Sequence, residues 1–178
     1  MRRVMIIGGP GSGKSTLARE IGARLALPVY HIDALFWQPG WVEGDRSALT
    51  ERLRAIHRTR EWVIDGNYSG SWEDRLAHAD TAILLDRPTG LRAWRVLRRT
   101  LRYLGRTRPD LAPGCPEHVD PGFVRFVLGY GGERRRRALA LLATAPTHVV
   151  VHHIRDHAGV AELSAGIARQ RSVASERE

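Results

Sequence analysis

Five short and continuously apolar segments recur along the chain, and segments with helical periodicity separate them. The apolar segments cover residues 4–7, 27–33, 61–66, 81–86 and 147–154. Runs that are apolar throughout are typical of parallel strands covered on both faces. The helical patterns cover residues 14–25, 46–59, 88–104 and 133–142. This alternation predicts a three-layer α/β sandwich, with helices on both faces of a five-stranded parallel sheet.

The segment over residues 105–122 interrupts this rhythm, because it is rich in proline and glycine and has no periodicity. A long loop of this kind in a compact domain is usually functional, so we expect a lid over an active site. The length suits a single core, and no linker is visible, so we expect one domain over residues 1–178. We expect the polar tail over 170–178 to be frayed.

Basic residues exceed acidic ones, with 28 Lys and Arg against 19 Asp and Glu and a formal net charge of +9. This excess favours an anionic partner: a nucleotide, a phosphorylated metabolite or nucleic acid. No apolar run approaches the roughly 18 residues of a membrane span. A single cysteine, Cys115, excludes an internal disulfide, so the cytoplasm is the expected compartment. The oligomeric state is left open.

The stretch GGPGSGKS at residues 8–15 matches the phosphate-binding P-loop pattern G-x-x-x-x-G-K-[ST], with a predicted strand before it and a helix after it. Glycines let backbone N–H groups converge on phosphate oxygens, and the helix N-terminus adds partial positive charge. We expect Lys14 to reach the β- and γ-phosphates of ATP, and the Ser15 hydroxyl to bind Mg²⁺. The purely structural alternative is a glycine-rich turn with an exposed lysine. The expected nucleotide site comprises Gly8, Gly9, Pro10, Gly11, Ser12, Gly13, Lys14, Ser15 and Thr16.

Two aspartates end predicted strands, at the sheet edge where ligands bind in open parallel sheets. Asp65 closes the run WVID, the pattern expected of a carboxylate that holds Mg²⁺ through water. Asp33, in HID, is a candidate to orient an acceptor hydroxyl or to accept its proton. His31 lies two residues earlier on the same face and is a candidate acceptor contact. The alternative for each aspartate is a helix N-cap or a loop residue.

Two helical patterns are rich in arginine. Over residues 88–104 an apolar stripe and an arginine stripe lie on opposite sides. We expect the apolar stripe to pack on the sheet and the arginines to face solvent or a cleft. Within 133–142, Arg134 and Arg137 project toward the apolar side, where a guanidinium needs an anion. That anion is a structural carboxylate or, if these arginines are catalytic, the transferring phosphate. The two stripes of the first helix are Leu91, Trp94, Leu97, Leu101 and Leu104, and Arg92, Arg95, Arg99, Arg102 and Arg106.

Several motifs together resemble the topology-modulation protein family, a bacterial group of small P-loop proteins related to adenylate kinase. The motifs are GGPGSGKST, HIDALFW, WVIDGNYSG, the run from residue 75 to 88, and the arginine helix. The resemblance implies a nucleoside-monophosphate-kinase-like fold with Asp65 at the Mg²⁺ site. It also implies nucleotide contacts from Arg95 and Arg99, and Arg134 and Arg137 on the helix that returns from the lid. The acceptor site that it implies includes Asn67, Tyr68 and Arg75.

These observations predict an ATP-dependent phosphotransferase that passes the γ-phosphoryl group to a small acceptor, a nucleotide or nucleoside. One alternative is a small-molecule kinase acting on a sugar or a hydroxy acid. A DNA-binding regulatory NTPase is an alternative of another class, which the basic charge favours. Against it, no nucleic-acid-binding module is recognisable, and aromatic residues are not interleaved with the basic runs. The eight histidines are scattered, and His148, His152 and His153 are interpreted as structural.

Overall fold

Five strands form one parallel sheet in the structure, a computed structural model that describes residues 1–175. The sheet order is β2-β5-β1-β6-β7, and each neighbouring pair runs parallel, which confirms the predicted architecture. The register pairs Ile6 with Asp65 and Gly8 with Leu85, so the carboxyl ends of three strands meet at one edge. The strands are β1 (Arg3–Gly8), β2 (Val29–His31), β5 (Trp62–Asp65), β6 (Thr81–Leu85) and β7 (Val150–Ile154).

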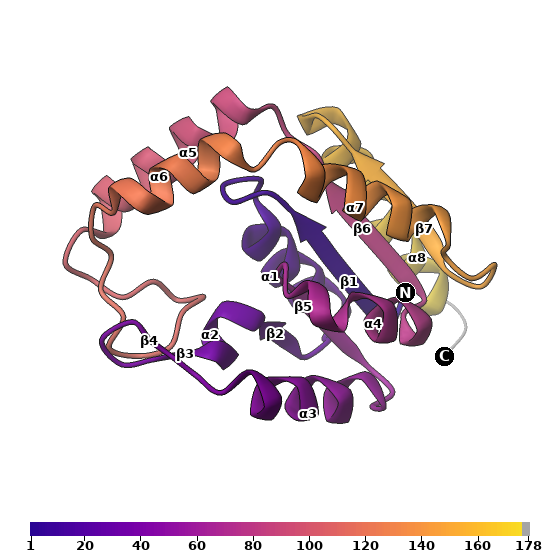
Figure 1. The fold of residues 1–178 in the computed structure, drawn as a ribbon. Helices are drawn as coiled ribbons and strands as arrows, with labels where there is room; N and C mark the ends of the chain where they lie inside the picture. Colours follow the sequence, from indigo (N-terminus) through magenta and orange to yellow (C-terminus); the bar gives the residue numbers. More distant parts are fainter. Residues whose placement is uncertain (176–178) are drawn as a thin grey trace.

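Helices cover both faces of this sheet (Figure 1). One face carries α1 (Lys14–Leu25) and α8 (His157–Ser175), and its apolar cluster includes Ile21, Ile83 and Ile167. The opposite face carries the second core cluster, built around Leu53, Trp62 and Leu142. The helices on that face are α3 (Arg46–His57), α4 (Trp72–His78) and α7 (Glu133–Ala143). Two separate apolar layers therefore hold the sheet between them, as the uniformly apolar strands require.

The second strand is shorter than the predicted segment 27–33. The helix α2 (Ile32–Phe36) begins directly after β2, so Asp33 lies in its first turn. A small antiparallel hairpin follows, formed by β3 (Trp37–Gln38) and β4 (Val42–Glu43). After β5, a short 3-10 helix, η1 (Ser69–Ser71), leads into α4.

The helices α5 (Thr89–Tyr103) and α6 (Pro121–Gly129) lie side by side above the P-loop (Figure 1). The predicted packing of α5 is wrong: its apolar stripe is exposed, and Arg92 is buried on the side of the P-loop. The reason is the surface that α5 meets, which is P-loop main chain and not the sheet. Carbonyl oxygens of that loop accept hydrogen bonds from guanidinium groups, and apolar side chains offer no such donor. The exposed apolar side chains are Trp94, Leu97, Leu101 and Leu104.

The segment between α5 and α6 crosses to the β3–β4 hairpin (Figure 1). Gly40 N donates to Gly114 O at 2.7 Å, and Trp41 Nε1 donates to Pro116 O at 2.8 Å. A small apolar cluster of Leu111, Ala112 and Cys115 packs against Trp37 and Trp41. The predicted loop over 105–122 is therefore irregular, but residues 111–116 anchor it to the hairpin, and it is followed by α6 from Pro121.

At the C-terminus, α8 continues to Ser175, so the segment 170–175 of the expected frayed tail is helical. The last residues of that tail, 176–178, lie outside the described part of the chain. Within the part that the structure describes, no helix combines the length and the apolar character that crossing a membrane requires.

The N-cap of α3 gives a direct test of this local structure. Asp45 accepts hydrogen bonds from Ser47 N at 2.9 Å and Ala48 N at 3.3 Å. We expect Asp45→Ala to lower the free energy of unfolding by about 1 kcal/mol, measured by urea denaturation. Glu51→Ala is the control, because Glu51 pairs only with Arg54 on the exposed face of the same helix, and its loss costs less than about 0.5 kcal/mol. Equal losses in both variants would contradict the capping role.

Candidate active site

The P-loop passes so close to β6 and α5 that two of its positions accept only glycine. Gly8 has a φ of +147°, and a methyl group there would overlap Leu85 O. Gly11 has a φ of +74°, and its methyl group would overlap Arg92 O. Gly13, the N-cap of α1, is also in the left-handed region with a φ of 101°. Close approach of neighbouring backbone therefore requires glycine at positions 8 and 11.

Lys14 is the only lysine of the chain. Its Nζ donates to Gly9 O across the loop at 3.0 Å, which holds the ammonium at the centre of the P-loop. Burial lowers the pKa of Lys14, while the charges of Asp65 and Asp33 oppose this shift. The ammonium and the two carboxylates are therefore close enough to influence one another. The predicted assembly of these three residues at one sheet edge is present in the structure.

The Asp65 carboxylate joins the P-loop to β2. Ser15 Oγ donates to Asp65 Oδ2 at 2.8 Å, and His31 Nδ1 is hydrogen-bonded to Asp65 Oδ1. Burial favours the neutral imidazole, but the hydrogen bond to Asp65 and its charge outweigh burial and raise the pKa of His31 above 6.5. A hydroxyl and a buried carboxylate at hydrogen-bond distance form an oxygen donor set of the kind that Mg²⁺ prefers, so the residues fit this ion.

Asp33 projects from the first turn of α2 beside the same group of residues. Asp33 is exposed, yet the surrounding protein raises the pKa of its carboxyl by desolvation, and the nearby Lys14 charge opposes this. Asp65 also raises it, because two carboxylates close together disfavour double ionisation. A carboxylate with a raised pKa is a better proton acceptor than an ordinary aspartate.

Three arginines of α5 face the P-loop. Arg92 donates to Arg87 O and to Thr89 Oγ1 and stacks on the Tyr130 ring, 5.3 Å from its centroid. Arg95 Nη1 donates to Ser12 O at 3.4 Å, and its Nη2 lies 2.8 Å from His157 Nε2. Arg99 is near enough to Lys14 for its charge to lower the pKa of that lysine. Arg95 and Arg99 thus lie beside the loop where the resemblance implies nucleotide contacts.

Sequence reasoning missed a charged cluster in the segment between α5 and α6. The buried Glu117 is paired with Arg108 and accepts from Thr100 Oγ1 at 3.2 Å. Arg108 also binds Asp110, with Nη1 3.0 Å from Oδ2. Burial opposes ionisation of Asp110, but the charge of Arg108 outweighs it and lowers the pKa of Asp110. The charges of Arg108 and Asp110 also act on Asp33, so this segment lies near the candidate site, and only its lack of periodicity and its proline and glycine content pointed to such a role.

The predicted acceptor residues after β5 are engaged with the protein itself. Asn67 Oδ1 accepts from Gly8 N at 3.1 Å, and its Nδ2 donates to Gly8 O at 2.6 Å. The Tyr68 hydroxyl lies 3.0 Å from Thr50 Oγ1 on α3. Arg75 is fully buried and donates to Gly66 O at 3.2 Å. In this conformation, these side chains position the chain around Asp65, and Arg75 has no surface to offer an acceptor.

The prediction that Arg134 and Arg137 point into the apolar side of their helix is wrong, because both are exposed. The buried positions of α7 are Ala138 and Leu142, which leaves Arg137 to one side of that line. Arg134 lies in the first turn, stacked 4.9 Å from the Phe126 centroid, and lines a cavity of about 360 Å³ beside Gly8 and Gly9. The arginine that meets a carboxylate is Arg135, whose Nε lies 2.9 Å from Asp86 Oδ1.

Comparison with known proteins shows the fold. No family model and no curated protein matches the chain. Shikimate kinase from Bacteroides thetaiotaomicron has a TM-score of 0.53 and 15% identity, covering 98% of each chain. Deoxyadenosine kinase from M. mycoides, with bound dCTP, has a TM-score of 0.51 and 12% identity over 94% of this chain and 98% of that chain. The YorR protein from Bacillus subtilis, in complex with phosphorylated GDP, has a TM-score of 0.53 and 12% identity over 97% of each chain.

The chain therefore has the α/β fold of P-loop kinases. Identities this low show the fold alone, and the resemblance to the topology-modulation family stays a prediction.

The pair formed by His31 and Asp65 is testable by NMR. We expect Asp65→Asn to bring the pKa of His31 below 6.5, because burial alone lowers it. Since the folded pKa is raised, the stability that the pair contributes is fully present below pH 6.5 and is lost as the pH rises through the folded value. Asp33→Asn is the control and should leave the His31 titration unchanged. An unchanged titration in Asp65→Asn would refute this account of the pair.

Proposed function

We propose that this protein is an ATP-dependent phosphotransferase that transfers the γ-phosphoryl group of ATP to a hydroxyl group of a small acceptor. The observation that carries the proposal is the meeting of Lys14, the Ser15–Asp65 pair and Asp33 at the carboxyl edge of a P-loop kinase sheet. Each of these groups suits one requirement of phosphoryl transfer: charge stabilisation, metal binding and activation of the acceptor.

The nucleotide would lie along the P-loop, where backbone N–H groups of the loop and the α1 N-terminus would face its phosphates. Lys14 would stabilise charge on the β- and γ-phosphates, and Arg95 and Arg99 would border the nucleotide from α5. Ser15 and Asp65 would hold Mg²⁺, which when bound neutralises phosphate charge. His31 orients the Asp65 carboxylate through its hydrogen bond.

Asp33 is the proposed base for the acceptor. As the acceptor oxygen forms its bond to the γ-phosphorus, the bond from that phosphorus to the bridging oxygen of ADP breaks, and the acceptor proton passes to the Asp33 carboxylate. The raised pKa of Asp33 supports this role, since it reflects a higher proton affinity of the carboxylate.

The segment over residues 105–122 is proposed as the lid. It runs from α5 to the β3–β4 hairpin, and the ion pairs of Arg108 with Asp110 and Glu117 hold it together near Asp33. Such a lid excludes water from the transfer step, so that phosphate passes to the acceptor and not to solvent. Arg134, at the mouth of the neighbouring cavity, is a further candidate phosphate contact.

The acceptor class is a nucleoside or nucleotide, or else a small hydroxy acid or sugar. The names of two structural neighbours, shikimate kinase and deoxyadenosine kinase, show that this fold serves both kinds of acceptor. A panel of nucleosides, nucleoside monophosphates, shikimate and sugars, with ADP release as the readout, decides between them. If ADP release rises with only one class of compound, that class contains the acceptor. If no compound of the panel raises ADP release, the result would count against a phosphotransferase acting on these acceptor classes.

Removal of the only lysine tests the nucleotide site. We expect Lys14→Ala to remain folded, because the side chain makes one hydrogen bond, and to lower turnover by about 100-fold or more through loss of charge stabilisation. Arg136→Ala removes an exposed cation on α7 and is the matched control, expected to act as the wild type. Turnover within a factor of two of the wild type in Lys14→Ala would refute the assignment.

A variant of Asp33 tests whether this residue acts in phosphoryl transfer and not in nucleotide binding. We expect Asp33→Asn to bind Mg-ATP as tightly as the wild type in a thermal-shift titration, and to lose about 100-fold or more in turnover with the identified acceptor, since a proton acceptor is lost. A variant that keeps its turnover, or that loses nucleotide binding instead, would rule out Asp33 as the base.

A further inference from the structure

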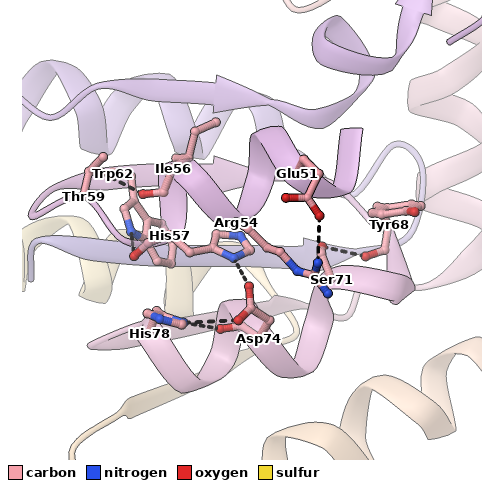
Figure 2. Close-up of polar contacts among 10 residues, drawn as sticks. All are labelled: Glu51, Arg54, Ile56, His57, Thr59, Trp62, Tyr68, Ser71, Asp74 and His78. Carbon is pink, nitrogen blue, oxygen red and sulfur yellow. Dashed lines mark hydrogen bonds and ion pairs between the residues drawn. The ribbon is translucent and has the colours of Figure 1, made fainter. Parts of the chain in front are cut away.

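Three side chains with metal-binding chemistry meet on the face of α3 and α4 (Figure 2). They are His57 at the end of α3, and Asp74 and His78 on α4. Figure 2 shows interactions from both imidazoles to the Asp74 carboxylate. The proposed kinase chemistry uses none of these residues.

The distances within this cluster are close to those of a metal site. His57 Nδ1 lies 2.6 Å from Asp74 Oδ2. His78 Nδ1 lies 3.5 Å from Asp74 Oδ1 and is hydrogen-bonded to the main-chain oxygen of Asp74 at 2.8 Å, a bond that metal binding through Nδ1 would replace. One ligand atom from each of the three residues lies within 4.8 Å of the others. In a tetrahedral site with bonds of 2.0–2.1 Å, ligand atoms are about 3.3 Å apart. Asp74 and His78 are half-buried, so small side-chain rotations there would provide this spacing, while His57 is fixed.

The cluster combines one rigid ligand with access from solvent. The His57 side chain is fully buried and packs against the Trp62 ring, and its Nε2 has no hydrogen-bond partner within the described residues. Its polar interactions are therefore made through Nδ1, toward Asp74. Asp74 and His78 are partly exposed, so solvent can reach the cluster from that side and supply a water as fourth ligand.

We propose that His57, Asp74 and His78 form a binding site for a zinc-class divalent transition-metal ion. Two imidazole nitrogens and one carboxylate oxygen suit such ions, whereas Mg²⁺ prefers oxygen ligands alone. The ion would fasten the end of α3 to α4, which carries Arg75, the residue that holds Gly66 O next to Asp65. The site is therefore structural, and it supports the strand end on which the active-site carboxylate lies.

The test measures Zn²⁺ binding to the untagged full-length protein, with Mg²⁺ in excess to occupy oxygen-rich sites. We expect one Zn²⁺ per chain by equilibrium dialysis, and a rise in Tm of about 5 °C or more at saturating Zn²⁺. His78→Gln and Asp74→Asn should each weaken Zn²⁺ binding by at least about 10-fold. Loss of a residue that only hydrogen-bonds to a metal ligand already lowers metal affinity by about that much. His148→Gln, which removes an exposed histidine elsewhere, should bind as the wild type does.

Co²⁺ provides a second readout, since a tetrahedral site with nitrogen ligands gives visible absorption that His78→Gln should abolish. Equal Zn²⁺ affinity in all four proteins would overturn the proposal, and so would the absence of bound Zn²⁺ in the wild type. The three residues would then be a hydrogen-bonded cluster only. Urea denaturation checks that each variant is folded, and Mg-ATP binding in the same samples separates this result from the fate of the kinase proposal.

Discussion

The Asp65 carboxylate, held between Ser15 and His31, is the interaction on which the arrangement of the site depends. The parallel register places Asp65 beside Ile6, two residues before the P-loop begins. A buried carboxylate must be hydrogen-bonded, and its two partners come from the start of α1 and the end of β2. One side chain thus fixes the P-loop, the Ser15 hydroxyl and the segment that carries Asp33 relative to one another.

The P-loop is enclosed from the other side by main chain and by guanidinium groups. Asn67 bonds both polar atoms of the Gly8 backbone, and Arg92 packs over Gly9 and Gly11. These contacts leave no room for side chains, and they direct positive charge toward the loop from α5. A segment with this surplus of positive charge and bare amides is suited to a polyphosphate. The same geometry explains why the apolar stripe of α5 is exposed.

Features encoded in short stretches of sequence could be predicted, and those that depend on distant packing could not. The five strands follow from apolar runs, and the P-loop with Ser15 and Asp65 follows from motifs that local chemistry explains. Periodicity finds two stripes on α5 but does not say which stripe faces inward, because the P-loop that it meets is about 80 residues away in sequence. The pairing of Glu117 with Arg108 within the irregular segment, and of His57 with Asp74 across two helices, has no periodic signature. Arg134 has the helical phase of the buried Ala138 and Leu142, but it lies in the first turn of α7, where it is exposed beside Phe126.

A crystal structure with Mg²⁺ and a non-hydrolysable ATP analogue is the most direct measurement of the central claim, which is that Ser15 and Asp65 form a metal site beside a phosphate-binding loop. The account predicts the triphosphate along residues 8–16, the ammonium of Lys14 between its terminal phosphates, and Mg²⁺ next to the Ser15 hydroxyl with Asp65 bound directly or through water. A nucleotide bound elsewhere, or a loop in which Lys14 keeps its bond to Gly9 O while the ligand is present, would contradict it.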